Sequence, residues 1–116
     1  MLKMFWPSKK PSEVSEFINE KINSKKVVIF SKSYCPYCHK VFNIFAQYLG
    51  KDLPENEYEV VELTTLPNAD AIQDELQKMT GARTVPRVFI NGKCIGGADD
   101  TVSALKSGLL YTLLTS

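Results

Sequence analysis

The chain has 116 residues, with 14 basic and 13 acidic side chains and a hydrophobic fraction of 44%. This length fits one domain whose core is large enough to fold without disulfide staples. A net charge of +1 gives no electrostatic basis for binding nucleic acid or an acidic membrane surface. The three cysteines are an odd number, which argues against a framework of structural disulfides.

Residues 1–11, MLKMFWPSKKP, are expected to form an N-terminal extension to a single domain at residues 12–116. Lysines and Pro7 interrupt the apolar residues of this extension, so it lacks the roughly 7–15 apolar residues of a signal-peptide core. The longest apolar run, residues 27–30, is far too short to span a bilayer. The sequence therefore predicts a cytoplasmic protein, in a compartment that keeps thiols reduced.

The first elements expected along the chain are a helix and a short strand. Ser12 suits the N-cap of the helix, whose apolar residues recur at helical spacing. These residues are Val14, Phe17, Ile18 and Ile22. Residues 25–30, KKVVIF, are typical of a buried strand because they are too apolar for a surface position.

The next helix carries a strongly periodic apolar stripe, and Gly50 is expected to end it. The stripe consists of Cys38, Val41, Phe42, Phe45, Tyr48 and Leu49. A second strand is expected at residues 58–63, YEVVEL. Asn68 is then expected to cap a helix that Gly81 ends. The predicted inner face of that helix is Ile72, Leu76 and Met79.

Residues 87–95, RVFINGKCI, predict a β-hairpin because Asn91–Gly92 suits a type I′ turn. Asp99 or Asp100 is expected to cap one final helix. The apolar residues of that helix are Val102, Leu105, Leu109 and Leu113. The element order is therefore α-β-α-β-α-β-β-α. Helices that cover both faces of a small mixed sheet make the predicted fold class α/β.

Residues 32–40, KSYCPYCHK, contain a C-x-x-C motif, which can bind zinc, anchor haem or act as a redox dithiol. A zinc site would take its four ligands from Cys35, Cys38, His39 and Cys94. However, His39 directly follows Cys38 on a predicted helix, so the two side chains point about 100° apart. Structural zinc sites usually present two close-spaced ligand pairs, and this chain has one, so no metal is expected.

The same residues match the haem-attachment pattern C-x-x-C-H. Covalent haem attachment belongs to exported or organellar chains, whereas this sequence carries no export signal. A strand that leads directly into the motif and a long helix is also the wrong context for a small all-α cytochrome. We therefore interpret His39 as a solvated residue at an exposed helix position.

A redox dithiol fits the motif best, because the motif lies where a strand passes into a helix. Pro36 suits the first helical position, where its missing N–H has no consequence. Cys35 then takes the N-cap, where its sulfur can accept the N–H groups of Tyr37 and Cys38. The helix dipole and the nearby Lys32 cation also favour the thiolate of Cys35. We expect Cys35 to attack the substrate disulfide and the deeper Cys38 to resolve the mixed disulfide that results.

Three motifs in this order resemble those of a dithiol glutaredoxin: CPYC after a strand, RTVP before the hairpin and GGADD before the last helix. The resemblance covers the chain from about Ser12 to its C-terminus. It implies a thioredoxin-like fold, in which helices flank a four-stranded mixed sheet. It also implies a cis peptide bond before Pro86, the alternative being a trans proline that opens an edge strand.

The resemblance implies glutathione-dependent thiol–disulfide exchange on glutathionylated or disulfide-containing proteins. Glutathione would be the reducing co-substrate, regenerated indirectly by glutathione reductase, and the protein would be a monomer. One alternative is an iron–sulfur carrier, in which two such domains bridge a cluster through Cys35 and glutathione. Pro36 counts against it, since cluster-binding relatives usually have a smaller residue there. The other alternative, a non-catalytic adaptor, is disfavoured by the intact C-x-x-C.

The resemblance further implies a glutathione groove made of Lys32, Tyr37, Arg83, Thr84, Val85, Pro86, Gly97, Asp99 and Asp100. Lys32 and Arg83 would bind the glycine carboxylate, with Tyr37 packed alongside. The N–H groups of Asp99 and Asp100 would bind the γ-glutamyl carboxylate. Asp100, or Asp99 if the cap falls one residue earlier, would bind the ammonium.

Two residues depart from these motifs. Ala98 stands where many dithiol glutaredoxins have Cys, Asn or Ser, so a side-chain contact from that position is lost. Cys94 lies outside the motifs, and we interpret it as a small core or edge-strand residue.

Overall fold

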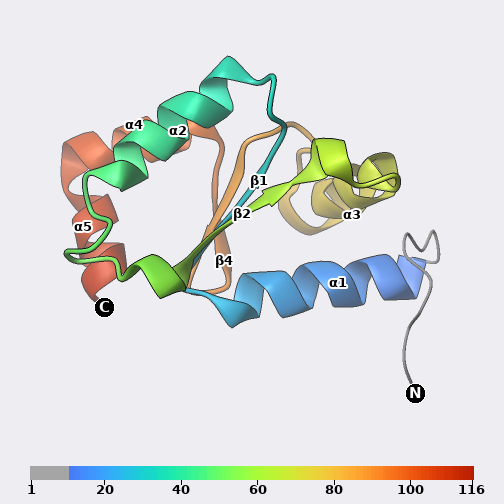
Figure 1. The fold of residues 1–116 in the computed structure, drawn as a ribbon, viewed down its shortest axis with the longest axis horizontal. Coiled ribbons are helices and arrows are strands. Elements are labelled where there is room, and N and C mark those ends of the chain that lie inside the picture. The colour runs from blue at the N-terminus through green and yellow to red at the C-terminus, as the bar shows by residue number, and fades with distance from the viewer. Residues whose placement is uncertain (1–10) are drawn as a thin grey trace.

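A computed structural model describes residues 11–116 of the chain. The five α-helices in this range are α1 (Pro11–Ser24), α2 (Pro36–Ala46), α3 (Ala69–Thr80), α4 (Ala98–Ser107) and α5 (Leu109–Thr115). The four strands are β1 (Val27–Ser31), β2 (Tyr58–Glu62), β3 (Arg87–Ile90) and β4 (Lys93–Gly96). Two short 3₁₀ turns lie at Glu55–Glu57 and Leu63–Thr65. Figure 1 shows the helices on either side of a central sheet.

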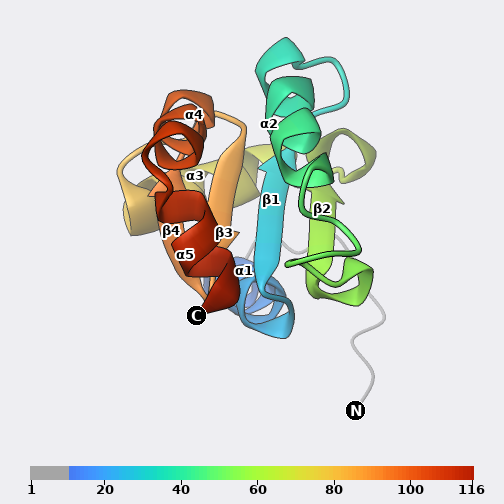
Figure 2. The same ribbon diagram turned by 90° about the vertical axis from the view of Figure 1, so that its left-hand side faces the viewer.

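The four strands form one mixed sheet in the order β2-β1-β3-β4, which confirms the predicted architecture. β1 pairs parallel to β2 and antiparallel to β3, with Val27 opposite both Tyr58 and Ile90. β3 and β4 form the predicted hairpin, and Asn91 and Gly92 have the positive φ angles, 54° and 80°, of a type I′ turn. Figure 2 views this sheet from the side of α2, α4 and α5.

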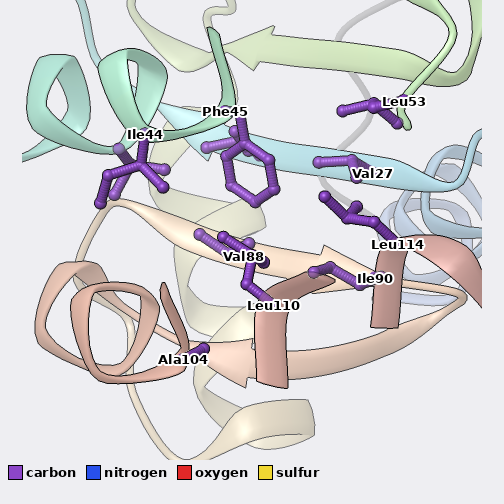
Figure 3. Close-up of a cluster of buried hydrophobic side chains, with 11 residues drawn as sticks. Val27, Ile44, Phe45, Leu53, Val88, Ile90, Ala104, Leu110 and Leu114 are labelled. Carbon is purple, nitrogen blue, oxygen red and sulfur yellow. The ribbon is translucent and has the colours of Figure 1, made fainter. Parts of the chain in front are cut away.

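Both faces of β1 are buried, which explains why the strand is apolar from Val27 to Phe30. Val27 and Ile29 point into a cluster beneath α2, α4 and α5 (Figure 3). Val28 and Phe30 point into a second cluster beneath α1 and α3. Successive side chains on a strand alternate between the two faces of its sheet, so β1 supplies two residues to each core. The end of this central strand is therefore a rigid support for whatever follows it.

The helix that follows β1 ends earlier than predicted. α2 stops at Ala46, and Gln47 takes the C-cap position instead of Gly50. Gly50 lies in a later turn, in which its N–H donates to the Leu53 carbonyl oxygen at 2.8 Å. Tyr48 and Leu49, expected on the helical stripe, pack against the core from this turn.

The single final helix that we expected is two helices. Gly108, with φ of 86°, ends α4 and starts α5. Of the four apolar residues predicted on this helix, Val102, Leu105 and Leu113 pack against the core, whereas Leu109 is 51% exposed. The buried residues of these two helices are instead Thr101, Ala104, Leu110 and Leu114. The break changes the direction of the chain, so one continuous helical periodicity could not describe both segments.

Three smaller predictions about helix ends and faces also differ from the structure. α1 begins at Pro11, so Ser12 lies inside the helix. Asn68 occupies the N-cap position of α3 but makes no capping hydrogen bond through its side chain. Met79, expected on the inner face of α3, is 38% exposed. Gly81 does end α3, in the left-handed conformation, as predicted.

The predicted N-terminal extension, residues 1–11, falls outside the described residues except for Pro11. Among residues 11–116, no helix has the length and apolar character needed to cross a membrane.

Candidate active site

The first functional feature is the junction between β1 and α2. Cys35 takes the N-cap position of α2, with Pro36 at the first helical position. Its sulfur accepts a hydrogen bond from the Cys38 N–H at 3.2 Å. The predicted second bond, from the Tyr37 N–H, is not formed. Cys35 is partly exposed, so its sulfur lies at the positive end of a helix and is open to a substrate.

The second cysteine of the motif is in a different environment. Cys38 is fully buried, at 0% exposure, on the inner face of α2. Burial raises the pKa of its thiol from the usual 9.0 to about 11, and Cys35 adds to the increase. The buried Ser31 hydroxyl and the Lys32 N–H act in the opposite direction and lower it. A raised pKa favours the protonated thiol of Cys38 at neutral pH, which is consistent with the predicted resolving role.

The segment before β3 faces the exposed sulfur. The Val85–Pro86 peptide bond is cis, as predicted. The Val85 carbonyl oxygen lies 3.8 Å from the Cys35 sulfur, which can donate to it as a thiol. Two side chains hold the backbone of this segment. Arg87 Nε donates to the Thr84 carbonyl oxygen at 3.0 Å, and Gln73 Nε2 to the Arg83 carbonyl oxygen at 2.9 Å.

The N-terminus of α4 lies on the other side of that segment. Gly97, not Asp99 or Asp100, takes the N-cap position, because α4 begins at Ala98. The Asp100 carboxylate folds back and accepts the Gly97 N–H at 3.0 Å. Asp100 is thus the capping carboxylate, while Asp99 stays exposed at the helix start. The first N–H groups of a helix have no partner within it, so this end is suited to binding an anion.

These elements surround a pocket of about 290 Å³. Its lining residues are Tyr37, Thr84, Val85, Pro86, Arg87, Gly97, Ala98, Asp99 and Asp100. The lining includes all of the predicted glutathione-binding residues except Lys32 and Arg83. Segments far apart in the sequence, the starts of α2, β3 and α4, therefore meet around one small hollow. Cys35 does not line it, but the Cys35 sulfur lies 3.8 Å from the carbonyl oxygen of Val85, which does.

The two predicted cations outside the pocket have partners of their own. The Lys32 ammonium lies 6.0 Å from the centre of the Tyr34 ring. Arg83 is bound to the side of α3, with its guanidinium 3.3 Å from Asp74 and 3.8 Å from Asp70. Its side chain is 42% exposed, so these ion pairs are solvated and weak.

Sequence reasoning missed the role of Arg87. This residue is only 9% exposed, yet it begins the otherwise apolar strand RVFI and lines the pocket. A charged residue at the start of a buried strand is the signal that could have identified it, because charged side chains are rarely buried without a partner.

Sequence reasoning also missed how the loop before Cys35 is held. The Ser33 N–H donates to a Glu62 carboxylate oxygen at 2.8 Å, and His39 Nε2 lies 2.9 Å from the Ser33 carbonyl oxygen. His39 is exposed, as predicted, but it is not merely solvated. Both backbone polar groups of Ser33 are thus fixed by side chains, one from β2 and one from α2.

The third cysteine lies away from this site. Cys94 is on the edge strand β4, opposite Phe89, and packs against the cluster beneath α1 and α3. Within residues 11–116, no group of three or more His, Cys, Asp or Glu side chains is placed to hold a metal ion. A larger pocket, about 570 Å³, lies at the other end of β1 near Lys26 and Gly92 and has no cysteine in its lining.

Comparisons with known proteins agree with this geometry. Residues 27–95 match the family model described as Glutaredoxin. The chain is 50% identical to Glutaredoxin-1 of Mus musculus over 99 residues, which cover 85% of this chain and 90% of that protein. It is 48% identical to Glutaredoxin-C4 of Arabidopsis thaliana over 103 residues, covering 89% of this chain and 72% of that protein.

Solved structures agree as well. Oxidized glutaredoxin 2 from Chlamydomonas reinhardtii superposes with a TM-score of 0.79 at 44% identity, covering 90% of this chain and 92% of that one. A buckwheat glutaredoxin–glutathione complex superposes with a TM-score of 0.81 at 38% identity, covering 90% of each chain. The predicted thioredoxin-like fold is thereby confirmed.

Proposed function

Since the chain belongs to the glutaredoxin family of glutathione-dependent thiol–disulfide oxidoreductases, we propose that it reduces protein–glutathione mixed disulfides and protein disulfides with Cys35 and Cys38. The observation that carries this proposal is the position of the Cys35 sulfur. It lies at the N-terminus of α2, accepts the Cys38 N–H, and faces the Val85 carbonyl oxygen at 3.8 Å. A helix N-terminus favours the thiolate, which is the attacking species in disulfide exchange.

The first step is attack by the Cys35 thiolate on the glutathione sulfur of a mixed disulfide. The bond between Cys35 and glutathione forms as the bond between glutathione and the protein breaks. The substrate protein leaves as a thiolate and takes a proton from solvent. A second glutathione, as its thiolate, then attacks the glutathione sulfur on Cys35. Oxidised glutathione is released, Cys35 is restored, and glutathione reductase returns the oxidised glutathione to the thiol.

The dithiol route uses Cys38 in place of the second glutathione. Cys38 attacks the sulfur of Cys35, the bound partner leaves as a thiol, and a Cys35–Cys38 disulfide forms. The proton of Cys38 passes to the leaving sulfur, so charge is balanced. Because burial raises the pKa of Cys38 to about 11, Cys38 must lose its proton as it attacks the mixed disulfide beside it. Two glutathione molecules later reduce the internal disulfide.

One end of glutathione would bind between the starts of α2 and β3. The Val85 backbone would pair with the cysteinyl residue as an added strand does. Lys32 and Arg83 would bind the glycine carboxylate, with Tyr37 packed alongside. Arg83 can leave its exposed ion pairs, worth about 0–1 kcal/mol, for a partly desolvated charge-assisted bond worth ~1.5–3 kcal/mol.

The γ-glutamyl end would bind at the start of α4. Its carboxylate would accept the N–H groups of Asp99 and Asp100, near the Gly97 cap. Because the Asp100 carboxylate is engaged with the Gly97 N–H, we assign the ammonium to Asp99. The sequence resemblance implies Asp99 as the ammonium-binding residue if the N-cap of this helix falls one residue earlier, and the assignment follows that alternative.

A turnover assay tests the proposal. The purified protein, a glutathionylated peptide, glutathione, glutathione reductase and NADPH are combined, and NADPH oxidation is followed. We expect NADPH consumption that depends on the protein and on the peptide. A rate no higher than that of the mixture without the protein would refute the proposal.

Further expectations from the sequence accompany this function and stay predictions. We expect a cytoplasmic protein that is a colourless monomer when purified. The alternative role as an iron–sulfur carrier predicts instead a brown dimer after anaerobic reconstitution with iron, sulfide and glutathione. Visible absorption and size-exclusion chromatography separate the two outcomes.

A further inference from the structure

The buried guanidinium of Arg87 has no counter-charge of its own. The side chain is 9% exposed, and its Nε is bonded to the Thr84 carbonyl oxygen. Within residues 11–116 it forms no ion pair with any Asp or Glu. Buried charges are normally paired, because an uncompensated charge in a poorly solvated place is unfavourable. An anionic ligand would supply what the protein lacks here.

The place that such an anion would occupy is defined by Gly97. A Cβ atom added to Gly97 would lie 3.1 Å from Arg87 Nη2 and 3.4 Å from the Pro86 carbonyl oxygen. The guanidinium therefore lies against the residue that precedes α4. The same residues line the 290 Å³ pocket, together with Asp99. A fixed positive charge and the free N–H groups at the start of α4 thus border one space.

We infer that Arg87 is a specificity residue that binds the α-carboxylate at the γ-glutamyl end of glutathione. This inference rests on the proposed function and adds a residue to its glutathione site. A guanidinium can donate two parallel hydrogen bonds to a carboxylate, with more geometric selectivity than a backbone N–H alone. With the Asp99 carboxylate at the pocket rim, the site presents both charges that a zwitterionic α-amino-acid group requires.

The alternative is that Arg87 only supports the fold, by holding the Thr84 carbonyl oxygen. That role would affect every substrate alike, since the Thr84–Pro86 segment lies beside Cys35. A role in binding one carboxylate would affect only substrates that carry this carboxylate. Two substrates that differ in this group alone therefore separate the two roles.

The test compares a glutathionylated peptide with the same peptide whose glutamyl α-carboxylate is amidated. We expect wild type to lose about tenfold in kcat/KM upon amidation, and Arg87→Gln to process both substrates about equally, at the lower rate. Arg87→Lys keeps the positive charge but cannot donate two parallel hydrogen bonds. This variant should retain part of the preference for the unmodified peptide. Lys106→Gln, which removes a charge from the far end of α4, is the matched control and should discriminate like wild type.

The inference would be overturned if a folded Arg87→Gln variant still preferred the unmodified peptide over the amidated one tenfold in kcat/KM. This holds even if the variant is slower than wild type on both peptides. If Arg87→Gln does not fold, full wild-type discrimination by Arg87→Lys would overturn it as well. Absence of wild-type activity on either peptide would instead sink the proposed function, and this inference with it.

Discussion

The N-termini of α2 and α4 border the same pocket but differ in how they are capped. At α2 the cap is Cys35, whose sulfur is the hydrogen-bond acceptor and the atom that we propose attacks the substrate. At α4 the cap is Gly97, which has no side chain, and Asp100 reaches back from inside the helix. A helix start capped by its own nucleophile is suited to chemistry, whereas one with a bare cap leaves space for a ligand. Changes at α2 should therefore alter the reaction, and changes near α4 should alter which substrate is chosen.

The largest effect is expected at the cap of α2. Cys35→Ser should abolish turnover of every disulfide substrate, because a hydroxyl is not ionised at neutral pH and no other thiol takes the N-cap position of α2. The assay is NADPH-linked turnover of a glutathionylated peptide. Cys94→Ser is the matched control and should keep wild-type turnover. Substantial activity in the Cys35 variant would show that another sulfur attacks.

Removing the buried Cys38 thiol of α2 should separate deglutathionylation from the reduction of protein disulfides. Cys38→Ser should keep deglutathionylation, since a second glutathione can clear Cys35, and should lose reduction of protein disulfides. The two rates are measured side by side on a glutathionylated peptide and on a disulfide-bonded protein. A Cys38 variant inactive on the glutathionylated peptide would disprove the one-cysteine route.

The difference between the two cysteines of α2 should also appear on titration. The pKa of Cys38 is raised to about 11, so reduced Cys38 should stay protonated through neutral pH and ionise only in strong alkali. Folding favours its protonated form, so this group should lower stability as pH rises from about 9 to about 11. The Cβ chemical shift of Cys38 in labelled protein reports the titration. A midpoint near neutrality would contradict the desolvation argument.

Among the residues proposed to bind glutathione, loss of Arg83 should weaken the binding of charged substrates only. Arg83→Gln should raise KM for a glutathionylated peptide by about tenfold, because one charge-assisted contact is lost. Attack on a small uncharged disulfide should barely change. Lys78→Gln removes a charge from the neighbouring helix, where the Lys78 side chain is 69% exposed, and serves as the control. Equal losses on both substrates would mean that Arg83 supports the fold through Asp70 and Asp74.

A smaller effect is expected from giving α4 a side chain at its cap. In Gly97→Ala, the new Cβ would lie 3.1 Å from Arg87 Nη2, which must move away from the start of the helix. We expect KM for the glutathionylated peptide to rise a few-fold, with kcat on a small uncharged disulfide unchanged. The backbone tolerates alanine, since φ at Gly97 is −106°. An unchanged KM would show that the pocket accommodates the methyl group.

Local patterns in the sequence were sufficient to place the two cysteines at α2. The apolar strand, Pro36 at the first helical position and the cysteine spacing are each set within about ten residues. They correctly placed Cys35 at the cap and Cys38 on the inner face. The same reasoning placed the hairpin turn at Asn91–Gly92, because positive φ angles are a local requirement.

Predictions that needed distant contacts were less successful. The expectation of one final helix was wrong because Gly108 divides it, and which side of α5 is buried depends on the sheet it packs against. Arg83 does not line the pocket, and its guanidinium is paired with Asp70 and Asp74 on α3. A sequence shows which residues can form an ion pair but not which of several partners lies within reach.

The sequence by itself determined the order of the strands, the order of the helices up to the last, and the position of Cys35 at a helix start, since helix starts, turns and strand alternation follow from neighbouring residues. Only the tertiary structure decided the raised pKa of Cys38 and the burial of Arg87 beside Gly97. Both are consequences of desolvation, which depends on what the rest of the chain packs around a group. The sulfur that we propose attacks can thus be recognised along the chain, whereas the pocket that we propose selects its substrate exists only where α2, β3 and α4 meet.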